Sequence, residues 1–211
     1  MIVLRNKEFS FFGLFGKKTM SPEEKLRRLN EYIDRGVKKK DSLSLSNLTS
    51  KSHEIERKLD IKFNKDWYKF LDIIVRFYSK NIPVWYNVLK SAKLDNINDF
   101  TGGGNIILAD DFFDIFPLPF PVMPYDDDED EDVCLITIGN DDCISYIPKN
   151  NSYEIFYKKR AKKLSDALRQ YDIKWRLKFH HDNFSFYKEN PDIYKIHLGI
   201  AEEYNKCIKI I

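Results

Sequence analysis

Three adjacent side chains, His180, His181 and Asp182, come closest to enzyme chemistry in this chain by type and spacing. Histidine and aspartate can act as general bases or bind metal ions. We expect the three residues to lie in a hairpin turn, where adjacent histidines point to opposite sides of the chain and do not share one metal. The other histidines, His53 and His197, lack the spacing of a zinc site. The sequence therefore predicts no metal site and no catalytic residue. An enzyme that uses His180, His181 and Asp182 is the least favoured of the three functional hypotheses considered below.

Two other segments could bind ligands by their composition. Gly102, Gly103 and Gly104 lack the Lys and the Ser or Thr that follow in a phosphate-binding loop, and acids surround them. The unbroken acidic run at residues 126–132 has neither the alternation nor the Gly of a calcium-binding loop. Loose binding of divalent cations by this run stays open. We expect no cofactor and no small-molecule substrate.

The charge is distributed unevenly along the 211 residues, although the formal net charge is only +2. Residues 94–148 contain 14 acids and no Lys or Arg. Residues 1–93 hold 21 bases and 11 acids, a net charge of +10, and residues 149–211 hold 14 bases and 8 acids, a net charge of +6. A chain with oppositely charged sectors attracts copies of itself head to tail, or attracts partners of either sign.

Two less specific interpretations of these charges remain. The acidic run alone could be a solvated loop, because like charges repel and keep such a run extended. Lys174, Arg176 and Lys178, with the basic residues at 158–163, could also contact nucleic-acid phosphates. No known DNA- or RNA-binding motif accompanies these cations, so a solvated basic face is the preferred interpretation.

The first 15 residues form an amphipathic arm that we expect to dock on a partner. Charged residues interrupt its apolar run, which is not the pattern of a secretion signal. No window of about 18 apolar residues occurs, so we expect no membrane span. Three cysteines favour a reducing, cytoplasmic location over a disulfide framework. The predicted partner-binding residues, in the arm and in the acidic run, are Phe9, Phe11, Phe12, Leu14, Phe15, Asp126, Asp127, Asp128, Glu129, Asp130, Glu131 and Asp132.

The first part of the chain reads as helical. Ser21-Pro22-Glu23-Glu24 combines a capping residue, a first-turn proline and a capping box. We predict an N-terminal arm with one helix over residues 1–45 and a single α+β domain over residues 46–211, with an acidic loop at 126–132. Further helices are expected at 50–59 and from Asn64, where an aromatic stripe has helical spacing, and a short helical piece is expected from Pro83.

The remainder reads mainly as strands. Four prolines make residues 117–124 extended, and strands are predicted at 133–138, 143–147 and 153–157. The basic residues 158–163 should open an inserted helix. Apolar and basic residues alternate over 173–179, which predicts a strand with one buried and one cationic face, paired with a strand at Phe184 and Phe186. Asn190-Pro191 begins a last helix with Ile193, Ile196, Ile200, Tyr204 and Ile208 on one face. Early helices and late antiparallel strands give an α+β fold.

The segment Leu4-Arg5-Asn6-Lys7-Glu8-Phe9-Ser10 resembles a short opening segment of proteins from tailed phages of gut bacteria. The resemblance covers about ten residues. It implies a virion component, such as a neck or tail ring subunit that assembles head to tail around a DNA conduit. A sector without bases would let DNA pass without specific binding. The location would then be the cytoplasm of a bacterial host, with incorporation into the virion.

A second resemblance is to the SMI1/KNR4 (SUKH) superfamily, which includes immunity proteins that bind toxins. Residues 54–59 and 63–71 are similar to the two opening helices of that family. Gly102-Gly103, and Ile136-Thr137-Ile138-Gly139 ahead of Ser145-Tyr146, resemble its later glycine turn and strand pair. The spacing between Leu71 and the glycines is longer than in the family, and the proline before the second helix is absent. The resemblance implies that the acidic sector faces a basic nuclease toxin.

These observations favour a non-enzymatic structural protein, a homo-oligomeric subunit of a tailed-phage particle that binds itself or other virion proteins. The alternative is an immunity or binding module that neutralises a basic toxin through its acidic sector. The first hypothesis predicts a defined oligomer that depends on residues 1–20. The second predicts a monomer or dimer that needs its acidic run to bind a cationic partner.

Overall fold

The computed structural model describes most of the chain from residue 43 onward. The described residues are 43–90, 112–122, 132–139, 142–155, 159–183, 187–188 and 190–211, with Ser21, Glu23, Glu24, Arg27, Asn30, Glu31 and Asp34. The elements in chain order are α2 (Leu45–Leu59), α3 (Lys65–Lys90), β1 (Leu118–Val122), β2 (Val133–Ile138), β3 (Asp142–Ile147), the 3-10 turn η2 (Pro148–Asn150), β4 (Ser152–Ile155), β5 (Lys159–Ala161), α5 (Leu164–Arg169), α6 (Ile173–Asn183) and α8 (Pro191–Ile208).

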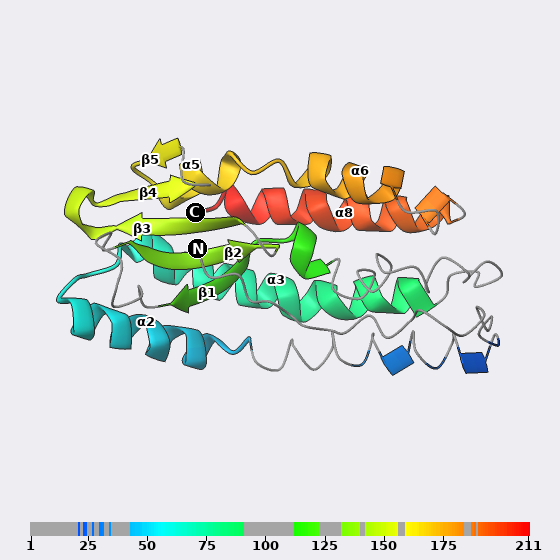
Figure 1. Cartoon of the computed structure of the whole chain (residues 1–211), viewed down its shortest axis with the longest axis horizontal. Coiled ribbons are helices and arrows are strands. Elements are labelled where there is room, and N and C mark those ends of the chain that lie inside the picture. The colour runs from blue at the N-terminus through cyan, green and yellow to red at the C-terminus, as the bar shows by residue number, and fades with distance from the viewer. Residues whose placement is uncertain are drawn as a thin grey trace, which may run out of the picture.

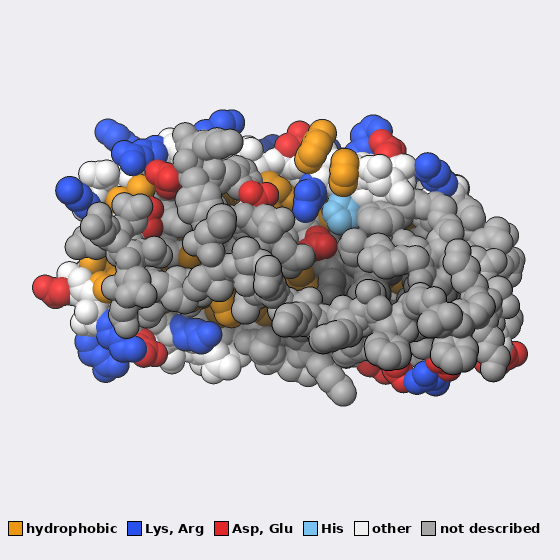
Figure 2. Space-filling model, viewed as in Figure 1, with side chains coloured by type: hydrophobic (Ala, Val, Ile, Leu, Met, Phe, Trp, Pro, Cys, Tyr) orange, Lys and Arg blue, Asp and Glu red, His pale blue; other side chains and the backbone are white. Residues whose placement is uncertain are grey.

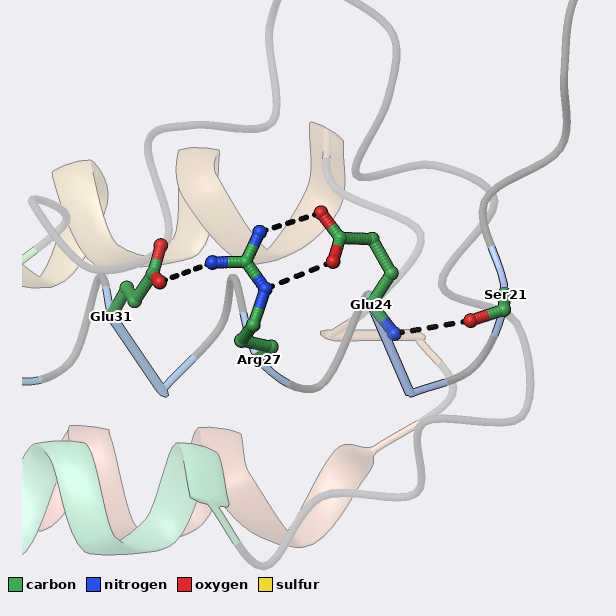
Figure 3. A network of polar contacts seen from close by, with 4 residues as sticks. All are labelled: Ser21, Glu24, Arg27 and Glu31. Carbon is green, nitrogen blue, oxygen red and sulfur yellow. Dashed lines mark hydrogen bonds and ion pairs between the residues drawn. The ribbon is translucent and has the colours of Figure 1, made fainter.

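The N-terminal helix start predicted at Ser21 is confirmed at the residues described there. The Glu24 amide donates a hydrogen bond to Ser21 Oγ at 3.3 Å, as an N-cap requires (Figure 3). Arg27 then bridges two acids, with both oxygens of Glu24 on one side and Glu31 on the other. These exposed pairs are spaced three and four residues apart, so they support one helical face. The boundary between arm and domain at residue 45 stays a prediction.

A buried carboxylate joins α2 to α3. Glu56 Oε1 accepts a hydrogen bond from the Phe63 amide at 2.7 Å, and Glu56 Oε2 lies 2.9 Å from His53 Nδ1. Burial alone would raise the pKa of Glu56, but the hydrogen bonds from His53 and Phe63 outweigh it and lower the pKa. Between the helices, Asp60 adopts the left-handed conformation that ends α2. The carboxylate therefore ties the connection that leads into α3 back to α2.

Helix α3 carries the aromatic stripe that the sequence predicts. Its fully buried side chains are Trp67, Phe70, Leu71, Ile74, Tyr78, Ile82 and Trp85. The predicted separate piece from Pro83 is wrong, because α3 continues through Pro83 as one helix. A proline inside a helix costs about 3 kcal/mol. Burial of Trp85, Tyr86 and Leu89 beyond the proline outweighs that cost.

The five strands form an antiparallel sheet in the order β1-β2-β3-β4-β5. Ile144 of β3 lies opposite Ile136 of β2 and Ile155 of β4, so branched side chains line its buried face. The segment predicted as extended forms the edge strand β1, where its prolines need no ladder hydrogen bond. Helix α2 contacts β1, and α5 contacts β4 and β5. Helices α3 and α8 lie side by side along the long axis of the molecule (Figure 1).

The predicted α+β class, with N-terminal helices, an antiparallel sheet and a C-terminal helix, is confirmed. The strand predicted at 173–179 is wrong, because these residues belong to helix α6. The Trp175 amide donates to Asp172 Oδ1 at 3.0 Å, which caps the helix, and the buried residues follow a helical period. The partner strand predicted at Phe184 and Phe186 falls outside the described residues.

Two smaller predictions also change. The helix predicted to open at 158–163 begins only at Leu164, because β5 pairs with β4 first. Helix α5 therefore follows the sheet and is not inserted in it. In α8, which begins after Asn190 as predicted, Ile196 is exposed and His197 takes the buried position beside it. Of the strand predicted at 153–157, the part up to Ile155 is confirmed as β4, and Tyr157 lies outside the described residues.

Replacement of the joining carboxylate tests this architecture. Glu56→Ala leaves the buried Phe63 amide without its acceptor, so we expect a loss of about 2 kcal/mol in the free energy of unfolding. Because the pKa of Glu56 is lowered, its contribution should be complete above the ordinary value of 4.5 and disappear as the pH falls through the lowered pKa. Urea unfolding at pH 7 and at pH 3 measures both effects.

Glu54→Ala on the same helix is the matched control. Glu54 forms an exposed pair with Lys58, and such pairs contribute little, so its removal should leave the free energy of unfolding nearly unchanged. Equal losses for the two variants would show that Glu56 has no special role.

Candidate functional site

Most of the predicted partner-binding residues lie outside the described part of the chain. This holds for Phe9, Phe11, Phe12, Leu14 and Phe15 of the arm and for residues 126–131 of the acidic run. Asp132, the last acid of the run, is partly buried immediately before β2. The glycine run at 102–104 also lies outside the described residues. The binding roles assigned to these segments stay predictions.

The triplet His180-His181-Asp182 lies in a helix and not in the predicted hairpin turn. The three residues form part of the last turns of α6, because residues 173–183 are helical. His180 and His181 are buried, and α8 adds the fully buried His197. The rings of His181 and His197 are 5.7 Å apart between centroids. Three of the four histidines therefore share one region, which no sequence window indicates because His181 and His197 are 16 positions apart.

Aromatic rings enclose these histidines. Trp85 of α3 stacks on His197 with centroids 3.3 Å apart, and Tyr187 stacks on His181 at 3.7 Å. Neither ring nitrogen of His197 has a hydrogen-bond partner among the described residues. Burial, followed by the neighbouring His180, lowers the pKa of His181 to about 3, and burial lowers the pKa of His197 well below its usual value. Both rings are therefore neutral near pH 7 and act as core side chains.

Metal chemistry has no support in the described part of the chain. There, no three His, Cys, Asp or Glu side chains come close enough together to hold an ion. Cys134 and Cys143 lie on neighbouring strands, and contact between their side chains, followed by burial, raises the pKa of Cys134. A thiol with a raised pKa is protonated at neutral pH and is a poor nucleophile.

An aromatic pair stands on the solvent side of α6. Trp175 and Phe179, one helical turn apart, are 60% and 46% exposed, and their rings stack with centroids 5.7 Å apart. Their neighbours Lys174 and Lys178 form exposed ion pairs with Glu202 and Asp182. Figure 2 shows hydrophobic side chains at the surface over α6, beside a Lys or Arg and a His. The predicted strand placed Trp175 and Phe179 in the core, so sequence reasoning missed this surface.

The three cations of the predicted strand do not share one face. Lys174 and Lys178 are spaced by four residues on an exposed side of α6. Arg176 instead reaches the turn between β2 and β3. A Cβ atom added to Gly139 of this turn would lie 3.4 Å from Arg176 Nη2. Gly139 also has a φ of +63°, which favours glycine there. The flat cationic strand face that could have met phosphates is therefore absent from this segment.

Comparison of the chain with protein-family models, with curated proteins and with solved structures finds no match. Among the described helices, none is long and apolar enough to cross a membrane.

The buried histidines predict a pH dependence of stability. The unfolded chain binds protons on His181 and His197 below their ordinary pKa of 6.5, whereas the folded chain does not. Stability should therefore be complete above pH 6.5 and fall as the pH decreases toward 3, by up to about 1.4 kcal/mol per pH unit for each histidine. In His197→Phe, urea unfolding at pH 7, 6 and 5 should show a smaller slope. An unchanged slope would contradict the assignment of His197 as a neutral core residue.

Proposed function

We propose that this chain is a non-enzymatic structural protein whose copies assemble head to tail. The observation that carries the proposal is the exposed Trp175–Phe179 stack on α6. Trp is enriched among the residues that dominate binding energy at protein interfaces, and its exposure in an isolated chain leaves apolar area in water. A partner that covers both rings would remove that area from water. The chain's surface thus supports protein binding more strongly than catalysis.

The charge layout supports a contact between unlike surfaces. The aromatic stack lies in the part of the chain with a net charge of +6, whereas residues 94–148 carry 14 acids and no base. When one surface of a copy binds a different surface of the next, the contact is heterologous and produces rings or filaments. Opposite charges also favour this arrangement over the pairing of identical surfaces. The expected assembly is therefore a ring or a short stack.

The resemblance of residues 4–10 to a phage segment supports a more specific assignment, a neck or tail ring subunit of a tailed-phage particle. In such a ring, a surface rich in Asp and Glu would repel DNA phosphates and allow DNA to pass without specific binding. The partners are then other copies of this chain and other virion proteins.

The mass of the protein in solution tests the proposal. Light scattering after size exclusion at low salt should give a discrete species several times heavier than 25.1 kDa. At 1 M salt it should dissociate, because the screening length falls from about 10 Å at 0.1 M to about 3 Å. Trp175→Ser combined with Phe179→Ser should weaken the association at least tenfold without loss of helical content.

Val84→Ser is the matched control, because Val84 is a 40% exposed apolar residue on α3, a different helix from the one that carries the aromatic stack. Its association should equal that of the wild type. A monomer of 25.1 kDa at every salt concentration would contradict assembly through charge.

A second function, an immunity-type binding module, is favoured by the order of the elements. Two packed helices, α2 and α3, precede an antiparallel strand pair, β2 and β3, whose turn contains Gly139. The resemblance to the SMI1/KNR4 superfamily implies this order for the same residues. The acidic sector would then bind a basic nuclease toxin, with charge complementarity increasing the association rate.

Titration with purified basic nuclease domains of bacterial toxins tests this second function. One of them should bind in the micromolar range or tighter, and replacing the acids at 126–132 by Asn and Gln should weaken binding at least a hundredfold. Binding that does not depend on these acids would contradict the proposed surface.

A further inference from the structure

A groove of about 350 Å³ opens between α5, α6 and the last turns of α8. Among the described residues that line it, four are cations, Arg169, Lys174, Lys206 and Lys209, and one, Glu202, is an acid. The cations come from three elements that the fold brings together. These described residues therefore give the groove a local net charge of +3, and its volume suits a small anion or a few acidic side chains.

Two of these cations have no ion-pair partner among the described residues. Lys206 and Lys209 are exposed and form no ion pair with any described residue. Lys174 pairs with Glu202 at 3.2 Å and Arg169 pairs with Asp166 at 3.6 Å, both at positions about half exposed, where such pairs contribute little. An incoming carboxylate can therefore meet Lys206 and Lys209 without first breaking a strong interaction.

The end of α8 does not require these lysines as a cap. The Lys209 amide donates to the Asn205 carbonyl at 3.3 Å, and the Ile210 amide donates to the Cys207 carbonyl at 3.2 Å. Lysines near a helix C-terminus usually compensate its exposed carbonyls. In α8, backbone amides already donate to two of these carbonyls, so the side chains of Lys206 and Lys209 remain available to a ligand.

The floor of the groove is apolar. Leu168 of α5 and Ile208 of α8 contribute to its lining, and both side chains are nearly fully buried in the core. Because their side chains are held in the core, the elements that carry the cations are held in place. The cations thus stand around a preformed depression, which lowers the entropy lost when a ligand binds.

We propose that this groove binds the acidic run, residues 126–132, of a second copy of the chain. The inference rests on the proposed head-to-tail assembly and names its contact surfaces. The run offers seven consecutive carboxylates within 55 residues that contain no base, so no cation of its own segment competes for them. An extended stretch of seven residues spans about 23 Å, so the run can place several carboxylates in the groove while continuing past both ends.

Binding of a synthetic peptide tests the groove directly. A fluorescent peptide of residues 123–133 is titrated with the full chain whose own acids at 126–132 are replaced by Asn and Gln, so that they do not compete. We expect binding that weakens at least tenfold between 0.05 and 0.5 M salt. Lys206→Glu combined with Lys209→Glu should weaken it at least tenfold further, and a peptide with Asn and Gln in place of its acids should not bind.

Lys58→Glu combined with Lys149→Glu makes the same change in charge away from the groove and is the matched control. It should bind the peptide within twofold of its parent. Equal weakening by the two double variants would show that net charge and not the groove determines binding, which would overturn the inference. Displacement of the peptide by an oligonucleotide of equal charge at lower concentration would also overturn it, because the groove would then be a nucleic-acid site.

The mass of the protein in solution distinguishes a failure of this inference from a failure of the proposed function. If Lys206→Glu with Lys209→Glu leaves a salt-sensitive oligomer intact, the chain assembles but not through this groove. If the groove inference is correct, this variant is monomeric. Mixing it with a variant that carries Lys in place of Asp127 and Asp128 should then restore association, because the charges are exchanged between the two surfaces.

Discussion

The structure depends on the burial of one face of α3. Trp67 and Phe70 of α3 stack on each other, and Phe63, which immediately precedes the helix, contacts Tyr146 of β3 at 5.5 Å between ring centroids. Further along, Phe77 meets Tyr204 of α8 at 5.5 Å. Each buried aromatic side chain removes roughly 150–250 Å² from water, so this stripe outweighs the local preferences of the segments that it contacts. The helix and the residue that leads into it therefore contact both α8 and the sheet.

The position of α6 follows from that of α8, and the two sides of α6 have different roles. Ile173, Leu177 and His181 complete the core, whereas Trp175 and Phe179 remain in solvent. The helical period separates these sets, because positions two apart face different directions. The same packing places the cations of α5, α6 and α8 around one groove. The surfaces proposed for assembly are thus a consequence of how the core is built.

The sequence correctly predicts the elements whose apolar residues fit only one period, that of a helix or that of a strand. The prediction is wrong where the apolar residues fit both periods. The stripe of α3 and the apolar run of β2 are unambiguous, and both are confirmed. Residues 173–179 alternate like a strand, yet positions 173 and 177 also fit a helix, and in the structure Asp172 caps that helix. The groove was not predictable, because its cations at 169, 174, 206 and 209 come together only through tertiary packing.

Zero-length cross-linking of carboxylates to lysines tests most directly whether copies associate through opposite charges. A mixture of isotopically light and heavy protein is cross-linked at low salt and cleaved with chymotrypsin, because residues 94–148 contain no site for trypsin. We predict mixed-isotope cross-links between Lys206 or Lys209 and the acids at 126–132. Cross-links confined to one isotope, or acids joined only to lysines outside the groove, would contradict the account.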